Sequence, residues 1–203
     1  MAPSRRALVL DVWPWDGNLN EVKDALSQGR ILAIPTESSY GLAVDPLSAS
    51  GVEAIYRLKE RERGKPLPVV VASLEQAIDL GLEPNESIRL AEAHWPAPLT
   101  VVAPLRAGLS VPAAAGGDTL AVRVPDHDRL RALLQTLGHP LTATSANRSG
   151  EPPACDLADL EPILHAAGAL VLGGERTPGG LASTVVSWTS AGLRVLRRGR
   201  FQI

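Results

Sequence analysis

The hydrophobic positions of this chain follow two patterns that take turns along the sequence. Short apolar runs rich in Val, Ile and Leu are typical of strands buried inside a sheet. Between these runs, apolar residues return every three or four positions, which predicts amphipathic helices. The expected strands are Ala7–Leu10, Ile31–Ile34, Leu67–Ala72, Leu99–Pro104, Thr119–Pro125, Leu141–Ser145 and Ala169–Leu172.

The predicted helices have recognisable start and stop signals. Asn18 precedes Glu21 by three residues, and Ser50 precedes Glu53 by the same spacing, so both pairs match a capping box. Gly29 and Gly138 follow apolar periodic segments and predict helix ends. The remaining helices are expected to begin at Ser73, to cover Asn85–His94 and Asp126–Leu137, and to extend over Asp156–Ala167 with Pro162 inside.

Strands that alternate with helices predict an α/β protein. The end of the chain differs, because Ser183–Thr189 and Leu193–Arg197 flank Ser190-Ala-Gly and indicate a β-hairpin. A hairpin requires antiparallel pairing, so the sheet is expected to be mixed. With no internal repeat or linker, residues 1–203 are predicted to form one domain.

Composition narrows the class of protein. The chain has 45% hydrophobic and 21% charged residues, which is ordinary for a globular protein. The single cysteine, Cys155, excludes an internal disulfide and fits a reducing compartment. No apolar run approaches the length of a membrane span and no secretory signal is visible, so a cytoplasmic protein without a membrane partner is expected. The net charge of −2 argues against a dedicated nucleic-acid binder with a global basic field.

Four hydroxyl side chains follow the apolar run Ile31–Ile34. They are Thr36, Ser38, Ser39 and Tyr40, and Gly41 comes next. In open α/β sheets, ligand pockets commonly form at the carboxyl ends of strands, where small hydroxyl side chains can contact the ligand. A plain polar turn after a strand accounts for the same residues, and the stretch alone does not separate the two.

Basic residues cluster in two places. Lys59, Arg61, Arg63 and Lys65 precede a predicted buried strand, and Arg197, Arg198 and Arg200 lie near the C-terminus. Lys and Arg held close together suit a polyphosphate, although taken alone each cluster is more commonly a solvated charged surface or tail. Small hydroxyl and amide groups also follow Leu141, up to Gly150. Familiar phosphate loops, dinucleotide fingerprints, metalloprotease motifs and nucleophile elbows are absent.

Several motifs together resemble one family. Pro35-Thr-Glu-Ser-Ser-Tyr-Gly-Leu42 is similar to its Pro-Thr-Glu-Thr-Val-Tyr-Gly-Leu motif, and Lys59-x-Arg61 with Pro66-Leu67 is similar to its Lys-x-Arg-Pro-x-x-x-Pro-Leu motif. Further matches follow in the same order at Trp95–Thr100, Thr119–Arg123, Ser145–Gly150, Ser183–Val186 and Leu196–Gly199. By these motifs the chain is identified as a member of the YrdC-like family of threonylcarbamoyl-adenylate synthases.

The resemblance implies a twisted mixed β-sheet flanked by helices, with a basic concave cleft. It implies an enzyme that joins L-threonine, bicarbonate or CO2 and ATP into threonylcarbamoyl-adenylate, releasing pyrophosphate, for threonylcarbamoyladenosine in tRNA. The residues implied to hold ATP are Lys59, Arg61, Lys65, Thr119, Ser145, Asn147 and Arg197. Of these, Lys59 and Arg61 are also implied to be the catalytic residues. Those implied to bind threonine are Thr36, Ser38, Arg123 and Ser183. Mg2+ is expected to arrive with the ATP phosphates, with no metal ligand from the protein.

Four positions depart from the family pattern. Ser38 stands where the family has threonine, Glu62 where it has proline, and Val70 and Pro153 where relatives often have histidine and serine. They bear on substrate affinity more than on the class of reaction. The alternative function is a non-catalytic member of the superfamily that binds double-stranded RNA. For the enzyme, the expected partners are downstream threonylcarbamoyl-transferase proteins, and contact with RNA or tRNA is expected on the basic cleft.

Overall fold

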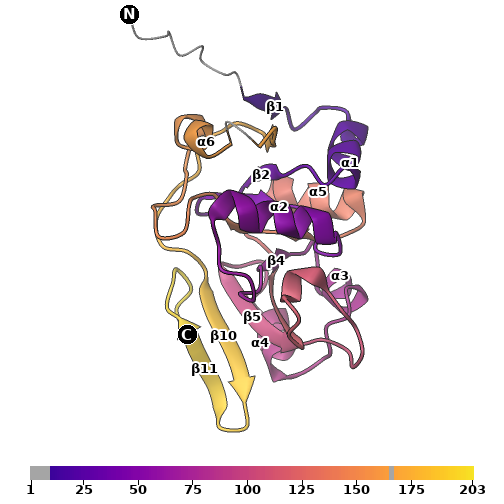
Figure 1. Cartoon of the computed structure of the whole chain (residues 1–203). Helices are drawn as coiled ribbons and strands as arrows, with labels where there is room; N and C mark the ends of the chain where they lie inside the picture. The colour runs from indigo at the N-terminus through magenta and orange to yellow at the C-terminus, as the bar shows by residue number, and fades with distance from the viewer. Residues whose placement is uncertain (1–9, 165–166) are drawn as a thin grey trace, which may run out of the picture.

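The computed structural model describes residues 10–164 and 167–203, and over these residues it has two mixed β-sheets flanked by helices (Figure 1). One sheet has the order β1 (Asp11–Trp13), β9 (Leu170–Leu172), β2 (Leu32–Pro35), β3 (Tyr40–Ala43), β8 (Thr144–Ser145). The other has the order β11 (Gly192–Arg197), β10 (Thr184–Thr189), β5 (Leu99–Pro104), β6 (Thr119–Arg123), β4 (Val69–Val70), β7 (Leu141–Thr142). The predicted mixed α/β class is confirmed, with the strands divided between two sheets.

The described helices are α1 (Leu19–Ser27), α2 (Ala49–Lys59), α3 (Leu74–Asp79), α4 (Glu86–His94), α5 (Asp128–Leu137) and α6 (Leu157–Leu164), and Pro112–Ala114 forms a short 3-10 turn. None of these helices combines the length and the apolar character needed to cross a membrane.

Strand β2 shows why its run of apolar residues is unbroken. Leu32 and Ile34 pack in a hydrophobic cluster with residues of α1 and α5, whereas Ile31 and Ala33 pack in a second cluster with residues of α2 and α6. Successive side chains of a strand point to opposite faces, so a strand covered on both faces needs apolar residues at every position. This strand therefore lies in the middle of the protein, and the polar turn after it starts from a fixed point.

The predicted strand Leu141–Ser145 is divided between the two sheets. Its first half, β7, pairs antiparallel with β4, and its second half, β8, pairs antiparallel with β3. Between them, the Ala143 backbone N–H donates to the Pro68 carbonyl at 2.8 Å. This segment holds the edges of both sheets next to each other, which is where the pocket described below lies.

Most predicted helix starts are confirmed and two are corrected. Asn18, Ser73 and Asn85 cap α1, α3 and α4 with their side chains. The cap predicted at Ser50 is wrong, because the Ser48 side chain accepts the Gly51 N–H and starts the helix two residues earlier. Helix α5 begins at Asp128 and not at Asp126, because His127 Nδ1 accepts the Leu130 N–H at 3.2 Å. An imidazole nitrogen can replace the usual hydroxyl or carboxylate at this position.

Strand β3 (Tyr40–Ala43) was not predicted, because it follows the polar turn after Pro35 directly. The other differences lie at the ends of elements. The strand expected at Ala7–Leu10 falls outside the described residues except for Leu10, and β1 starts at Asp11. Helix α6 ends at Leu164, and residues 165–166 of the predicted segment also lie outside the described part. The terminal hairpin is confirmed as β10 and β11, which extend beyond the helices at the lower left of Figure 1.

Ala115 offers a test of backbone strain away from the pocket. It has a φ of 55°, in the left-handed region that costs a residue with a Cβ about 1 kcal/mol. Replacing Ala115 with Gly is therefore expected to raise the free energy of unfolding in urea by about 0.5–1 kcal/mol. The matched control, Ala132→Gly inside α5, should lower it by about 1 kcal/mol. Loss of stability in both variants would contradict the strain at Ala115.

Candidate functional site

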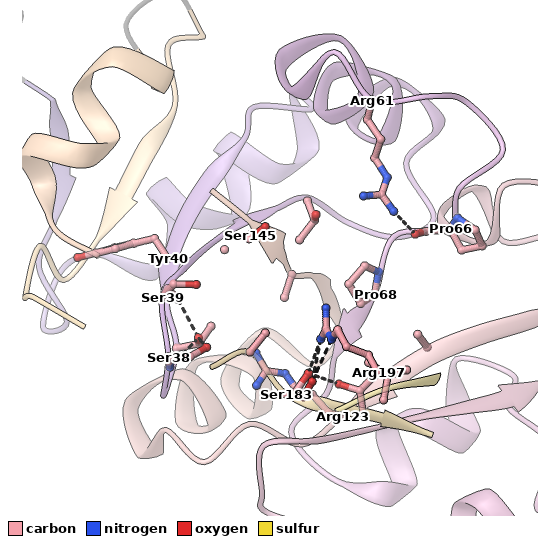
Figure 2. Close-up of a pocket in the computed structure, with 18 residues that line it drawn as sticks. Ser38, Ser39, Tyr40, Arg61, Pro66, Pro68, Arg123, Ser145, Ser183 and Arg197 are labelled. Carbon is pink, nitrogen blue, oxygen red and sulfur yellow. Dashed lines mark hydrogen bonds between the residues drawn. The ribbon is translucent and has the colours of Figure 1, made fainter. Parts of the chain in front are cut away.

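A cavity of about 370 Å³ opens between the two sheets (Figure 2). The β2–β3 turn and β8 line it from one sheet, strands β5, β6, β10 and β11 line it from the other, and Arg61 and Pro66 come from the loop after α2. Seven residues predicted from the sequence line the cavity: Thr36, Ser38, Arg61, Arg123, Ser145, Ser183 and Arg197. Residues up to about 160 positions apart in the chain are thus brought together as expected.

The segment 36–40, with its four hydroxyl side chains, forms a turn and also lines one wall of the pocket. It joins the antiparallel strands β2 and β3, and Thr36 Oγ1 donates to the Ser39 carbonyl at 2.7 Å and accepts the Ser38 N–H at 3.3 Å. Thr36 and Ser38 are buried and line the cavity. Tyr40 does not present its hydroxyl there, because it points away from the cavity (Figure 2) and donates to the Glu175 carbonyl at 2.6 Å. Burial, assisted by Glu175 and Asp156, raises the pKa of Tyr40.

Arg197 and two hydroxyls form a connected group on the opposite wall. The Arg197 guanidinium donates to the Ser183 carbonyl at 2.9 and 3.1 Å and to Ser183 Oγ at 3.1 Å. Ser183 Oγ in turn lies 2.8 Å from Thr100 Oγ1. Burial lowers the pKa of Arg197. Thr100 was not among the residues predicted for the site, although it lies in a motif that was recognised, because nothing in the sequence says which face of its strand it occupies.

Arg123 stands at the end of β6 with its side chain 10% exposed. Its Nη1 forms an ion pair with Glu37 Oε1, and the Glu37 side chain is 9% exposed. Burial, with Arg197 nearby, lowers the pKa of Arg123 to about 10. Glu37 was missed as a site residue; the available signal was one carboxylate among the hydroxyls that follow a buried strand.

Arg61 folds the loop after α2 onto itself. Its Nη2 donates to the Pro66 carbonyl at 3.1 Å, as Figure 2 shows, and its Nε lies 3.4 Å from the Lys65 carbonyl. Lys65 Nζ forms an ion pair with Glu62 Oε2 at 2.8 Å, and both side chains are largely exposed. A hydrogen bond and attraction from Lys65 lower the pKa of Glu62. Glu62, which stands where the family has proline, thus pairs with the charge of Lys65, a residue predicted to contact phosphate.

Lys59 is buried, with only 3% of its surface exposed. Its ammonium donates to the Ser145 carbonyl at 2.5 Å, to the Asn147 carbonyl at 2.7 Å and to Asn147 Oδ1 at 2.9 Å. Burial first, and Arg61 second, lower the pKa of Lys59 to about 8. With all three donors used, Lys59 holds the segment that carries Ser145 and does not line the cavity.

Four predicted contacts lie outside the cavity lining: Lys59, Lys65, Thr119 and Asn147. The Asn147 side chain is engaged at both ends, because Oδ1 accepts from Lys59 and from Ser145 Oγ and Nδ2 donates to the Glu151 carbonyl. Thr119 is exposed on the face of β6 that also carries Arg123, since residues two and four apart share a face. Thr119 therefore extends the wall beyond the cavity.

The other two departures lie away from the cavity. Val70 is 1% exposed and packs in the cluster with α1 and α5, while its backbone pairs with Arg123 of β6. Pro153 is exposed, and its carbonyl lies 3.7 Å from Cys155 Sγ. Neither side chain lines the cavity. Among the described residues, no group of three or more His, Cys, Asp or Glu side chains is placed to hold a metal ion.

Comparisons with known proteins agree with this arrangement. The Sua5/YciO/YrdC family model, described as "Telomere recombination", matches residues 24–199. A threonylcarbamoyl-AMP synthase of Aliivibrio fischeri is 36% identical over 162 residues, which cover 78% of this chain and 87% of that protein. Two structures of P. abyssi Sua5, a double variant and a complex with L-threonine, align with TM-scores of 0.83 and 0.81 at 29% identity.

The alignment with P. abyssi Sua5 covers 95% of this chain but 61% and 58% of the two Sua5 chains. This chain therefore spans about three fifths of that protein, whereas it spans most of the bacterial synthase. With the family model extending over most of the sequence, the chain belongs to the Sua5/YciO/YrdC family. The resemblance drawn from the sequence motifs is confirmed.

Proposed function

We propose that this chain is a threonylcarbamoyl-AMP synthase, which joins L-threonine, bicarbonate or CO2, and ATP, and releases pyrophosphate. The observation that carries the proposal is one cavity in which the hydroxyls of the β2–β3 turn face three arginines, Arg61, Arg123 and Arg197. Such a site suits a small polar amino acid on one side and phosphates on the other. The similarity to a threonylcarbamoyl-AMP synthase and to a Sua5 structure with L-threonine supports it.

This reaction depends more on neutralising the negative charges of its substrates than on groups that donate or accept protons. The threonine amino group forms a carbamate, either from bicarbonate with loss of water or from CO2 with loss of a proton. A carbamate oxygen then attacks the α-phosphorus of ATP while the bond to the bridging oxygen breaks and pyrophosphate leaves. Both reactants are anions, so cations that hold them close lower the barrier. Arg123 would bind the threonine carboxylate, Thr36, Ser38 and Ser183 its polar groups, and Arg61, Lys65 and Arg197 the phosphates. Mg2+ would enter as MgATP and keep several of its waters.

The buried residues of the set take supporting roles in this scheme. Lys59 and Asn147 fix the backbone around Ser145, which lines the cavity, and Thr119 extends the surface on which the nucleotide would lie. The product is the activated donor for threonylcarbamoyladenosine in tRNA, so a cytoplasmic location, downstream threonylcarbamoyl-transferase partners and contact with tRNA belong to the same proposal.

The proposal is tested with purified protein, MgATP, L-threonine and bicarbonate. Pyrophosphate release should depend on all three substrates and should fall to background without threonine. Release that is the same with and without threonine would contradict the proposal. Salt-sensitive binding of double-stranded RNA in the absence of any ATP binding would favour the non-catalytic alternative.

Glu62 gives a prediction about ATP affinity. Because its carboxylate pairs with Lys65, replacing Glu62 with Gln should free the ammonium for phosphate and lower the KM for ATP about threefold, the scale of an exposed ion pair. The KM for threonine should stay unchanged. Glu83→Gln, a change of the same charge in the loop before α4, is the control. An unchanged KM for ATP in Glu62→Gln would remove Lys65 from the phosphate site.

A further inference from the structure

Glu37 stands between Thr36 and Ser38, which line the cavity, but does not line it itself. Both of its carboxylate oxygens and Arg123 Nη1 are fully buried, and the described residues provide no hydrogen-bond partner for them beyond the ion pair that they form together. A carboxylate with so little exposure is costly to bury unless it meets a cation. Among the described residues, Arg123 is thus the one cation that forms an ion pair with the Glu37 carboxylate.

The Arg123 guanidinium has a second, unused edge. Nη1 is committed to Glu37, whereas Nε and Nη2 make no hydrogen bond with any described residue and are not among the fully buried polar atoms that lack one. Arg123 lines the cavity, beside Ser183 and Arg197 in Figure 2. A guanidinium donates in a planar fork that matches a carboxylate by two parallel hydrogen bonds. The free edge can therefore receive a carboxylate from the cavity while Glu37 keeps the other edge.

The backbone of Glu37 is held from the C-terminal segment. Arg200 Nη1 donates to the Glu37 carbonyl at 2.5 Å, and the Arg200 N–H donates to the Ala182 carbonyl at 2.9 Å. Gly199 allows this approach, because a Cβ there would lie 2.1 Å from the Ala182 carbonyl oxygen. The turn that carries Glu37 is thus tied to the start of β10, on the wall where Ser183 lies.

We propose that Glu37 is the positioning residue of the amino-acid pocket: it holds Arg123 by one edge so that the other edge receives the carboxylate of the substrate. The inference rests on the proposed function and adds a residue that determines threonine affinity without touching threonine. Without Glu37, Arg123 would be a buried cation beside Arg197 with no anion to fix it, and it would turn away from its neighbour.

The test measures equilibrium binding of L-threonine and of MgATP separately, by calorimetry, to the full chain and to Glu37→Gln. We expect the Kd for threonine to rise about tenfold or more, the scale of a lost charged hydrogen bond, while the Kd for MgATP changes less than about twofold. Glu37→Asp, which keeps the charge but shortens the side chain, should fall between the two proteins. If Glu37→Gln does not fold, Glu37→Asp carries the test, with the same separation between threonine and MgATP.

The outcomes separate this inference from the proposed function. If the unaltered chain binds neither threonine nor MgATP, the proposed function fails. If the unaltered chain binds threonine and the Glu37 variants bind it equally well, the positioning role is wrong. Tighter threonine binding by Glu37→Gln would overturn it as well, because it would mean that Glu37 competes with the substrate for Arg123. An equal loss of threonine and MgATP affinity would point to a structural role and would also overturn it.

Discussion

Replacing Arg123 with Ala is expected to lower threonine-dependent pyrophosphate release about a hundredfold, mainly through a higher KM for threonine. The side chain supplies the unused guanidinium edge in the cavity, and its removal also leaves the buried Glu37 carboxylate without its cation. Two costs therefore add: the substrate carboxylate loses a paired donor, and a buried anion remains that repels it. The KM for ATP should change far less.

Arg123→Lys and Arg194→Ala complete this experiment. Lysine keeps the charge but offers no planar fork, so it should restore only part of the threonine affinity. Arg194 lies on β11 outside the cavity lining, and its replacement should leave the KM for threonine unchanged. If Arg123→Ala keeps the threonine KM of the unaltered protein, the assignment of the amino-acid carboxylate to Arg123 is wrong.

Replacing Lys59 with Met is expected to lower turnover about a hundredfold, although Lys59 does not line the cavity, because a displacement of about 1 Å at a reacting group has effects on this scale. Methionine has a similar length but no donor, so the carbonyls of Ser145 and Asn147 and the Asn147 amide oxygen would lose their shared partner. Hydrogen exchange of residues 145–151 should accelerate, and exchange in the β10–β11 hairpin should not. Slow exchange in residues 145–151 together with full turnover would contradict the role of Lys59.

The pKa of Lys59 adds a pH signature to the same residue. Because burial lowers it to about 8, the folded protein releases this proton at a pH where the unfolded chain, with a pKa of 10.5, still binds it. The unfolded state therefore holds more protons between about pH 8 and 10.5, and the contribution of Lys59 to stability rises with pH in that window. Turnover should fall over the same rise through pH 8, since the neutral amine has fewer N–H donors than the three acceptors need. Lys59→Met should lose both effects.

The sequence predicts the elements of this fold well where one local signal decides. Asn18, Ser73 and Asn85 start helices because their side chains can accept a backbone N–H, and the unbroken apolar run before Pro35 indicates a strand covered on both faces. The prediction that Ser50 caps a helix was wrong because Ser48, two residues earlier, has the same hydroxyl side chain, and the spacing alone does not distinguish the two serines.

The division of Leu141–Ser145 between two sheets could not be predicted, because pairing partners far away in the sequence decide it. The same limit applies to the site. The motifs indicated which residues gather, and seven of the predicted residues do line one cavity. The sequence could not show that the Lys59 ammonium donates all three of its hydrogens to acceptors in residues 145 and 147. Nor could it show that Arg123 forms an ion pair with Glu37. Both contacts depend on which side of an element faces the cavity.

The β2–β3 turn is the part of the amino-acid pocket that brings Thr36 and Ser38 to the cavity and Glu37 to Arg123. The most direct measurement is the fate of 13C-labelled bicarbonate incubated with the protein, MgATP and L-threonine, followed by mass spectrometry of the nucleotide products. We expect an adenylate that carries both the labelled carbon and threonine, formed only when all three substrates are present and strongly reduced in Arg123→Ala. Release of pyrophosphate with no labelled adenylate would contradict the proposed synthase activity.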